Sequence, residues 1–173
     1  MEGQIARISF RFILLLLIQG LILHRVNLGG EDFNYVQIFV YPFFIMLLPV
    51  QTGRILLILL AFLIGISVDI FYDSPGLHAS ASVFTAFIRP FVLSAVEPRG
   101  GYKINSVPTK NQFGFNWFVR YISILLILHL FWYFSLEVFQ ISRILIVILK
   151  TIASFIASIL FIGLYVVIFN PKN

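Results

Sequence analysis

The chain has 173 residues, of which 60% are hydrophobic and 11% are charged, and its 12 Lys and Arg outnumber its 7 Asp and Glu. A soluble domain of this size has no interior large enough to bury so many Phe, Ile and Leu side chains, so the composition excludes a soluble globular enzyme and a disordered chain. The basic residues form no dense run, which argues against a nucleic-acid-binding domain, and the absence of cysteine excludes disulfides and thiolate metal sites.

Six apolar stretches predict an all-α membrane protein with about six transmembrane helices in a single domain over 1–173, because a spanning helix needs about 20 mostly apolar residues. They cover 9–28, 36–50, 55–71, 77–96, 118–136 and 144–169. Backbone in hydrocarbon must satisfy its own hydrogen bonds, and the stretches lack the alternation of barrel strands, so each is expected to be helical. The second is short and contains Pro42 and Pro49, which predicts a broken, tilted or shallow helix.

The first stretch begins like a signal peptide, with Arg7 and Arg11 at its start. No small-x-small cleavage site follows it, and it ends near His24 and Arg25. We therefore expect an uncleaved first span.

The basic residues predict the orientation. With the N-terminus in the cytoplasm, Arg25 and Arg143 are the two basic residues on the outer side, and eight lie on the inner side. Those eight are Arg7, Arg11, Arg54, Arg99, Lys103, Lys110, Arg120 and Lys172. This positive-inside bias predicts that both termini and the loop 97–117 are cytoplasmic. The outer side then holds the acidic residues Glu31, Asp32, Asp73 and Glu137.

An acidic residue, Asp69, lies near the outer end of the third stretch, and a charge of this kind costs about 2.5–3.5 kcal/mol at the centre of a spanning helix. Ala61, Gly65 and Asp69 share one helix face, and small residues let another helix approach closely. Asp69 is either a polar contact inside the bundle or a marker of the span's end, because the turn residues 73–76 follow shortly after it.

The fourth stretch carries a polar stripe on one helix face, which is expected to look into the bundle. The stripe consists of His78, Ser82, Thr85 and Arg89, and Pro90 follows it. Arg89 has two interpretations: its side chain extends to the cytoplasmic interface, or it binds backbone carbonyls released by a break at Pro42 or Pro90.

Lys150 in the last stretch shares a face with Ser154 and Ser158. It lies seven residues, or about 10 Å, from Arg143. Depth alone therefore favours a pairing of Asp69 with Lys150 over a pairing of Asp69 with Arg89. The alternative is a lysine that reaches the outer interface with its long stem.

No catalytic or metal-binding pattern accompanies these residues. His129 and Gln19 are expected mid-membrane, where a lone histidine is usually a packing or hydrogen-bonding residue. Three histidines without a Glu or Cys cluster predict no metal, and no Ser-His-Asp arrangement or phosphate-binding glycine loop is visible. We therefore expect neither an enzyme nor a cofactor.

The stretch 41–102 resembles the MreD family of rod shape-determining proteins, in the form found in Bacteroidetes-type bacteria. The resemblance rests on Pro42, Leu47-Leu48-Pro49, Leu60-Ala61-Phe62-Leu63-Ile64-Gly65, Val68-Asp69-Ile70-Phe71, Ser74-Pro75-Gly76-Leu77-His78-Ala79, Phe87-Ile88-Arg89-Pro90-Phe91-Val92-Leu93 and Pro98-Arg99-Gly100-Gly101-Tyr102, with Phe115-Asn116-Trp117-Phe118 beyond it.

The resemblance implies a non-enzymatic scaffold of the bacterial cytoplasmic (inner) membrane that helps elongate the cell wall and maintain rod shape. The implied partners are the periplasmic protein MreC, a RodA-type glycosyltransferase with its transpeptidase, and MreB filaments. The implied fold is that of the substrate-binding subunits of energy-coupling-factor transporters, and a vitamin-binding importer subunit is the alternative function. Candidate contact residues for neighbouring helices or partners are Ala61, Gly65, Asp69, His78, Ser82, Thr85, Arg89, Pro90 and Lys150.

Overall fold

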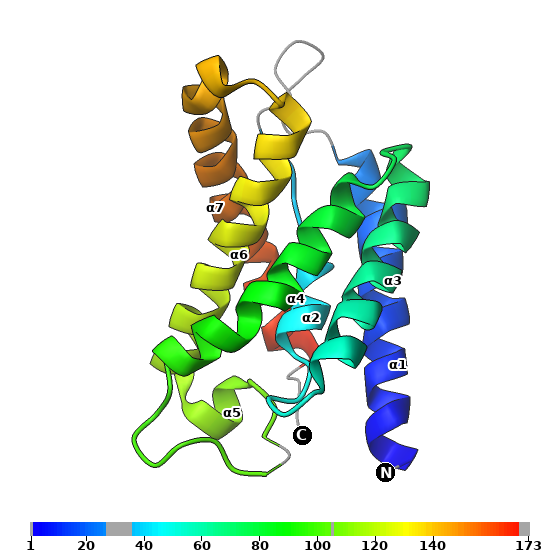
Figure 1. The fold of residues 1–173 in the computed structure, drawn as a ribbon. Helices are drawn as coiled ribbons and strands as arrows, with labels where there is room; N and C mark the ends of the chain where they lie inside the picture. Colours follow the sequence, from blue (N-terminus) through cyan, green and yellow to red (C-terminus); the bar gives the residue numbers. More distant parts are fainter. Residues whose placement is uncertain (1, 27–35, 105, 170–173) are drawn as a thin grey trace.

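The computed structural model describes residues 2–26, 36–104 and 106–169, and these residues form helices joined by loops (Figure 1). Five helices are long and apolar enough to cross a membrane. They are α1 (Glu2–Leu17, continued by η1 Ile18–Ile22 and η2 Leu23–Arg25), α3 (Arg54–Tyr72), α4 (Leu77–Ala95), α6 (Phe115–Val138) and α7 (Ile144–Phe169). Two short helices, α2 (Pro42–Met46) and α5 (Lys110–Phe113), and a 3₁₀ turn, η3 (Ile141–Arg143), complete the described elements.

The long helices run along one common direction (Figure 1). We call the end at which α1, α3 and α6 begin the base, and the opposite end the top. The predicted stretches 55–71, 77–96 and 118–136 are helical, with ends shifted by up to three residues, and 144–169 coincides with α7. The first helix begins earlier than predicted, at Glu2, and the last two residues of the predicted span 9–28 lie outside the described residues.

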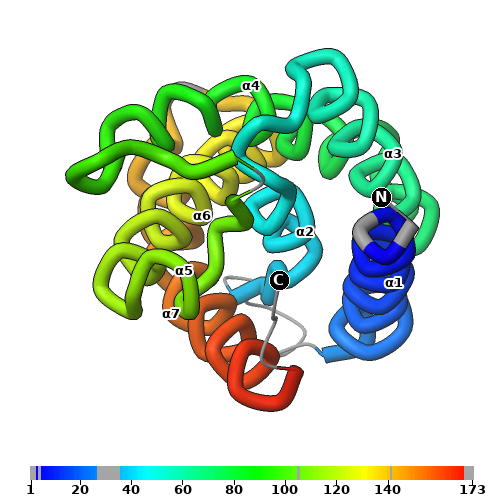
Figure 2. Tube along the Cα trace, turned by 90° about the horizontal axis from the view of Figure 1, so that it is seen from below, coloured from blue at the N-terminus to red at the C-terminus, as the bar shows by residue number. Residues whose placement is uncertain are grey.

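The second predicted span, 36–50, is not a transmembrane helix. Residues 36–40 are extended, only Pro42–Met46 form a helix of five residues, and the chain then turns back towards α3. Seen from the base, α2 lies near the centre of the ring of long helices (Figure 2). Its side chains are buried, as are those of residues 38–41. A break at Pro42 was expected from the sequence, whereas an extended segment inside the bundle was not.

The helices α3 and α4 are joined by a tight turn at the top. The helix α3 ends at Tyr72 and is followed by Asp73, which has a left-handed φ of 49°, and Gly76 with φ of 86° precedes α4. Pro90 lies inside α4 without ending it. Proline removes one backbone hydrogen bond from a helix, so α4 lacks the bond that residue 90 would otherwise donate.

The loop predicted at 97–117 is shorter than expected, because α5 begins at Lys110 and α6 at Phe115. It is attached to the bundle: the Val50 N–H donates to the Ser106 carbonyl at 2.8 Å, and the Tyr102 hydroxyl donates to the Leu93 carbonyl at 2.7 Å. Burial raises the pKa of Tyr102 to about 12. The flexible connector suggested by its glycines is thus tied down at several points.

Basic residues of the described chain lie at both ends of the bundle. The loop residues Arg99, Lys103 and Lys110 lie at the base together with Arg54, while Arg25 and Arg143 lie at the top (Figure 1). The extended segment and α2 lead from top to base, so the alternation of the chain is preserved with five helical crossings. Glu31, Asp32 and Lys172 lie outside the described residues.

Candidate functional site

The polar side chains of the long helices meet in the interior, where they connect α4 to its neighbours. Asp69, only 4% exposed, accepts hydrogen bonds from the backbone N–H groups of His78 at 2.9 Å and Ala79 at 3.0 Å. Its Oδ1 also lies 2.9 Å from the Ser74 hydroxyl and 3.0 Å from His78 Nδ1. A carboxylate that receives the first free N–H groups of a helix stabilises its N-terminus. Asp69 is therefore a cap for α4 supplied by α3.

The same face of α3 makes the closest helix contact. A Cβ added to Gly65 would lie 2.5 Å from the Ala79 Cα and 2.7 Å from the His78 carbonyl oxygen, both backbone atoms of α4. Ala61 is fully buried on the same face. The small residues thus allow the two backbones to approach, as the spacing predicted.

The middle of the α4 stripe binds α6 and the segment that precedes α2. Thr85 Oγ1 lies 2.8 Å from His129 Nδ1, and the Tyr41 hydroxyl lies 2.9 Å from His129 Nε2. All three side chains are fully buried. His129 therefore joins two elements by hydrogen bonds, which agrees with the role expected for a lone buried histidine.

Two buried polar atoms of the stripe, His78 Nε2 and Ser82 Oγ, have no hydrogen-bond partner among the described residues. The His78 ring lies among four aromatic rings, those of Phe39, Tyr41, Tyr72 and Tyr133, with centroid distances from 4.8 to 5.9 Å. The His78 side chain is therefore hydrogen-bonded through Nδ1, which faces Asp69 and Ser74, while the aromatic rings surround the rest of the imidazole.

Arg89 at the lower end of the stripe is 1% exposed, so the interpretation that it extends to an interface is wrong. Its Nη2 donates to the carbonyls of Leu48 and Pro49, the latter at 3.3 Å, and its Nε donates to the Tyr121 hydroxyl at 2.9 Å. Tyr121 in turn donates to the Met46 carbonyl at 3.0 Å. Arg89 therefore binds backbone carbonyls, as the second interpretation expected, but these carbonyls follow α2 and are not ones released by a break at Pro42 or Pro90.

The extended segment is held by side chains of α7 and of the π-helical turn that continues α1. The N–H groups of Gln37 and Phe39 donate to the hydroxyls of Ser154 at 3.0 Å and Ser158 at 2.8 Å. On the opposite side, the amide of Gln19 receives the Val40 N–H at 2.8 Å and donates to the Ile38 carbonyl at 2.9 Å. The segment therefore obtains from side chains the hydrogen bonds that a helix makes within itself.

The predicted pairing of Asp69 with Lys150 is wrong. Lys150 Nζ lies 2.8 Å from Glu137 Oε2 on α6, with the two side chains 16% and 25% exposed, and Asp69 is occupied by α4. Depth along the membrane matched Asp69 to Lys150, but it carries no information on which helices are neighbours. The alternative was that Lys150 reaches towards the outer end of the bundle. Its ammonium does extend towards the top, where it donates a hydrogen bond to Glu137 in the last turn of α6.

Most of the candidate residues are inner helix contacts and not surfaces for a partner. The most buried have exposed fractions of 0–4%. They are Ala61, Asp69, His78, Ser82, Thr85 and Arg89, and Gly65 is buried as well. Pro90 and Lys150 are half-buried. The sequence analysis assigned no contact to Tyr121 or Glu137, for which no spacing signal exists, and it placed Gln19 mid-membrane without assigning it a partner.

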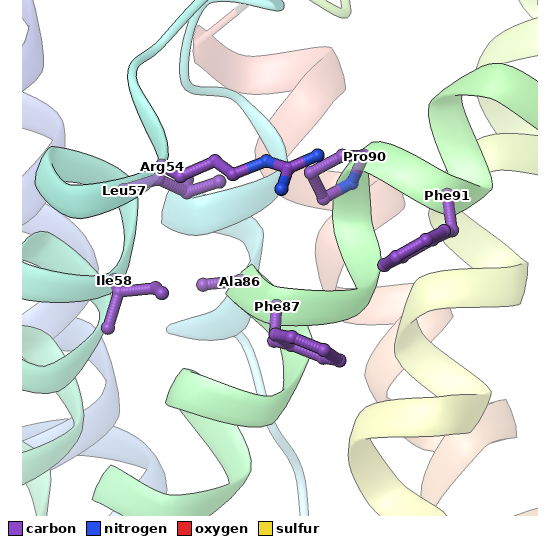
Figure 3. Close-up of a pocket in the computed structure, with 7 residues that line it drawn as sticks. All are labelled: Arg54, Leu57, Ile58, Ala86, Phe87, Pro90 and Phe91. Carbon is purple, nitrogen blue, oxygen red and sulfur yellow. The ribbon is translucent and has the colours of Figure 1, made fainter.

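Pro90 lines a notch between α3 and α4 at the base (Figure 3). Leu57, Ala86 and Phe87 form apolar walls, and the Arg54 side chain extends across the base end of the notch towards Pro90 (Figure 3). The notch has a volume of about 40 Å³, which holds no more than a few water-sized groups. It is too small to be a substrate site.

No protein family, curated protein or solved structure matches the chain significantly. The fold itself defines the class: an all-helical bundle with five helices long and apolar enough to cross a membrane fits a multi-pass membrane protein.

Proposed function

We propose that the protein is an MreD-type scaffold of the bacterial cytoplasmic membrane, a non-enzymatic subunit of the machinery that elongates the cell wall. Under this proposal the base is cytoplasmic and the top faces the periplasm. The protein would bind an MreC-like periplasmic partner and, with it, a RodA-type glycosyltransferase, its transpeptidase and MreB filaments.

One observation carries the proposal: the short motifs behind the resemblance contact one another. Leu48 and Pro49 of one motif accept hydrogen bonds from Arg89 of another. Gly65 lies against Ala79, and Asp69 caps the helix that contains His78. Motifs whose residues contact one another are constrained together by the fold. The order of motifs that this chain has in common with the MreD family is therefore better explained by a shared fold than by chance within an apolar chain.

The use of the embedded charges supports a scaffold. Asp69 fastens α3 to α4, Arg89 fastens α4 to the end of α2, and Lys150 fastens α7 to α6. Internal bonds of this kind fix the bundle, and a fixed bundle presents its outer faces and end loops in a constant geometry. We place the partner contacts there, because the inner stripe is already occupied.

Coexpression with the MreC-like protein of the same cell, followed by affinity capture of the chain from detergent, tests the proposal. The expected result is a stable complex with this partner, together with cells that become round when the chain is depleted. Capture of a bound vitamin or of an ATPase pair, with cell shape unchanged, would instead favour the importer subunit and overturn the scaffold.

The orientation has its own test. Reporter fusions at Gly100 in the base loop and at Ser74 in the top turn are expected to report the cytoplasm and the periplasm, respectively. The reverse result would contradict the topology even if the partner bound, so the two parts of the proposal fail separately.

A further inference from the structure

An apolar groove lies on the outside of α6 and α7, in their base halves. It has a volume of about 690 Å³, within the range of about 300–1,000 Å³ that ligand pockets occupy. The first turns of α6, from Phe115 to Ile122, form one wall, and the last turns of α7, from Ile159 to Val167, form the other. Seven residues of helix rise about 10 Å, so the groove runs a substantial way from the base into the apolar zone.

The floor of the groove is open at Gly163. A Cβ added to this glycine would meet no atom within 4 Å, in contrast to Gly65, where it would strike the backbone of α4. Gly163 therefore serves no helix contact within the described chain. Its missing side chain is part of the space.

A single cation, Lys110, lines the base end of the groove. It is half-buried, and its ammonium forms no hydrogen bond or ion pair with another residue in the described ranges. Where the base meets the membrane surface, an ammonium at the mouth of an apolar groove is complementary to an anionic headgroup whose chain lies along the groove.

We infer that the groove binds an anionic glycerophospholipid, with one acyl chain between α6 and α7 and the phosphate at Lys110. A partner helix is the competing occupant, but helix interfaces in membranes are rich in small residues, and here bulky side chains such as Phe115, Leu160 and Leu164 surround one glycine. A flexible acyl chain adapts to such a surface. This inference does not depend on the proposed function.

Native mass spectrometry of the purified chain, titrated with phosphatidylglycerol or with phosphatidylcholine of the same acyl chains, tests the inference. We expect about fivefold tighter binding of phosphatidylglycerol, since one cation near a membrane surface favours an anionic lipid to about this extent. Lys110→Gln should abolish this preference and leave phosphatidylcholine binding unchanged. Gly163→Leu should weaken both lipids at least threefold by filling the groove, and it improves helix propensity, so the fold is retained.

Two matched controls define the site. Arg54→Gln removes another cation at the base beside the 40 Å³ notch, and Leu145→Phe adds bulk to α7 eighteen residues, or about 27 Å, from Gly163. Neither should change the lipid preference. Equal effects of Lys110→Gln and Arg54→Gln would overturn the inference, as would unchanged binding in Gly163→Leu. A photo-crosslinker placed at residue 163 should capture lipid in cells, and capture of a protein helix there would also overturn it.

Discussion

The segment 36–46 and the helix α7 are both apolar stretches of the sequence, yet they enter the bundle in different ways. The helix α7 makes its backbone hydrogen bonds within itself over Ile144–Phe169. The segment makes only the short helix α2, and its extended part relies on Gln19, Ser154 and Ser158. Apolar character therefore indicates that a segment is buried, but the backbone form depends on whether its neighbours supply hydrogen-bonding groups.

The polar residues that serve the segment lie on elements far away in the sequence. Gln19 comes from the π-helical turn of α1, and the two serines come from α7. A π turn widens the helix locally and occurs often at functional positions. The difference between the two regions predicts which substitutions lower the free energy of unfolding most. Substitution of side chains that hydrogen-bond the backbone of the segment should cost more than substitution of polar side chains on a regular helix.

The largest expected effect is that of Gln19→Leu. This change keeps the side chain's size but leaves the Ile38 carbonyl and the Val40 N–H buried without partners. Each such group costs about 1–3 kcal/mol, so we expect the free energy of unfolding to fall by about 3 kcal/mol or more. Denaturation in detergent micelles, followed by circular dichroism, measures this loss.

The matched control is Gln51→Leu, because Gln51 is exposed near the base and no described hydrogen bond involves its side chain. It should change stability by less than about 0.5 kcal/mol. If the two glutamine variants unfold alike, the extended segment does not need its side-chain partners.

The second effect concerns the other end of the segment, at α2. Arg89→Met should cost about 3 kcal/mol, since it leaves the carbonyls of Leu48 and Pro49 and the Tyr121 hydroxyl without their cation. Tyr121 is stacked on Trp117 at a centroid distance of 5.1 Å. In a Trp132→Phe background, Trp117 fluorescence should therefore shift in Arg89→Met.

Arg54→Met, which removes an exposed arginine, is the control and should leave the fluorescence unchanged. An unshifted spectrum in Arg89→Met, with wild-type stability, would show that the guanidinium contributes nothing to the position of α2.

The five long helices were predictable because each is a long apolar run with turn residues at its ends, such as 73–76 between α3 and α4. The form of 36–50 was not predictable in the same way. Pro42 and the short length indicated a break, but the extended backbone depends on Gln19 and on Ser158, more than 100 residues further along the chain. The sequence of residues 36–50 does not indicate which distant side chains will hydrogen-bond to its backbone.

The candidate site was predictable where one helix face carried the signal. The stripe from His78 to Arg89 lies inside the bundle as its spacing indicated, and Gly65 makes the close contact that small residues favour. Pairings between helices were not predictable, because spacing defines a face and a depth but not the neighbour opposite. Asp69 and Lys150 illustrate this limit, since each found a nearer partner on an adjacent helix.

A smaller effect is expected at Ser158, which belongs to α7 but serves the segment. Ser158→Ala removes the acceptor of the Phe39 N–H and should lower the free energy of unfolding by about 1 kcal/mol. Ser67→Ala is the control, because the exposed Ser67 hydroxyl donates only to the Leu63 carbonyl of its own helix. If both variants lost the same free energy of unfolding, the serine that binds the segment would matter no more than a serine bonded within its own helix. Amide hydrogen exchange at Phe39, faster in Ser158→Ala alone, provides a second measurement.

The smallest effect is expected at Lys150 and Glu137, a pair between two regular helices. The side chains are 16% and 25% exposed, and partly exposed ion pairs contribute less than about 1 kcal/mol and weaken with salt. In a double-mutant cycle, Lys150→Met and Glu137→Gln should therefore show a coupling energy below about 1 kcal/mol that falls further at high salt. Lys150→Met and Asp69→Asn should instead be additive, because each residue bonds elsewhere. Coupling of Lys150 to Asp69 larger than its coupling to Glu137 would show that depth, and not helix neighbourhood, determines how embedded charges pair in this protein.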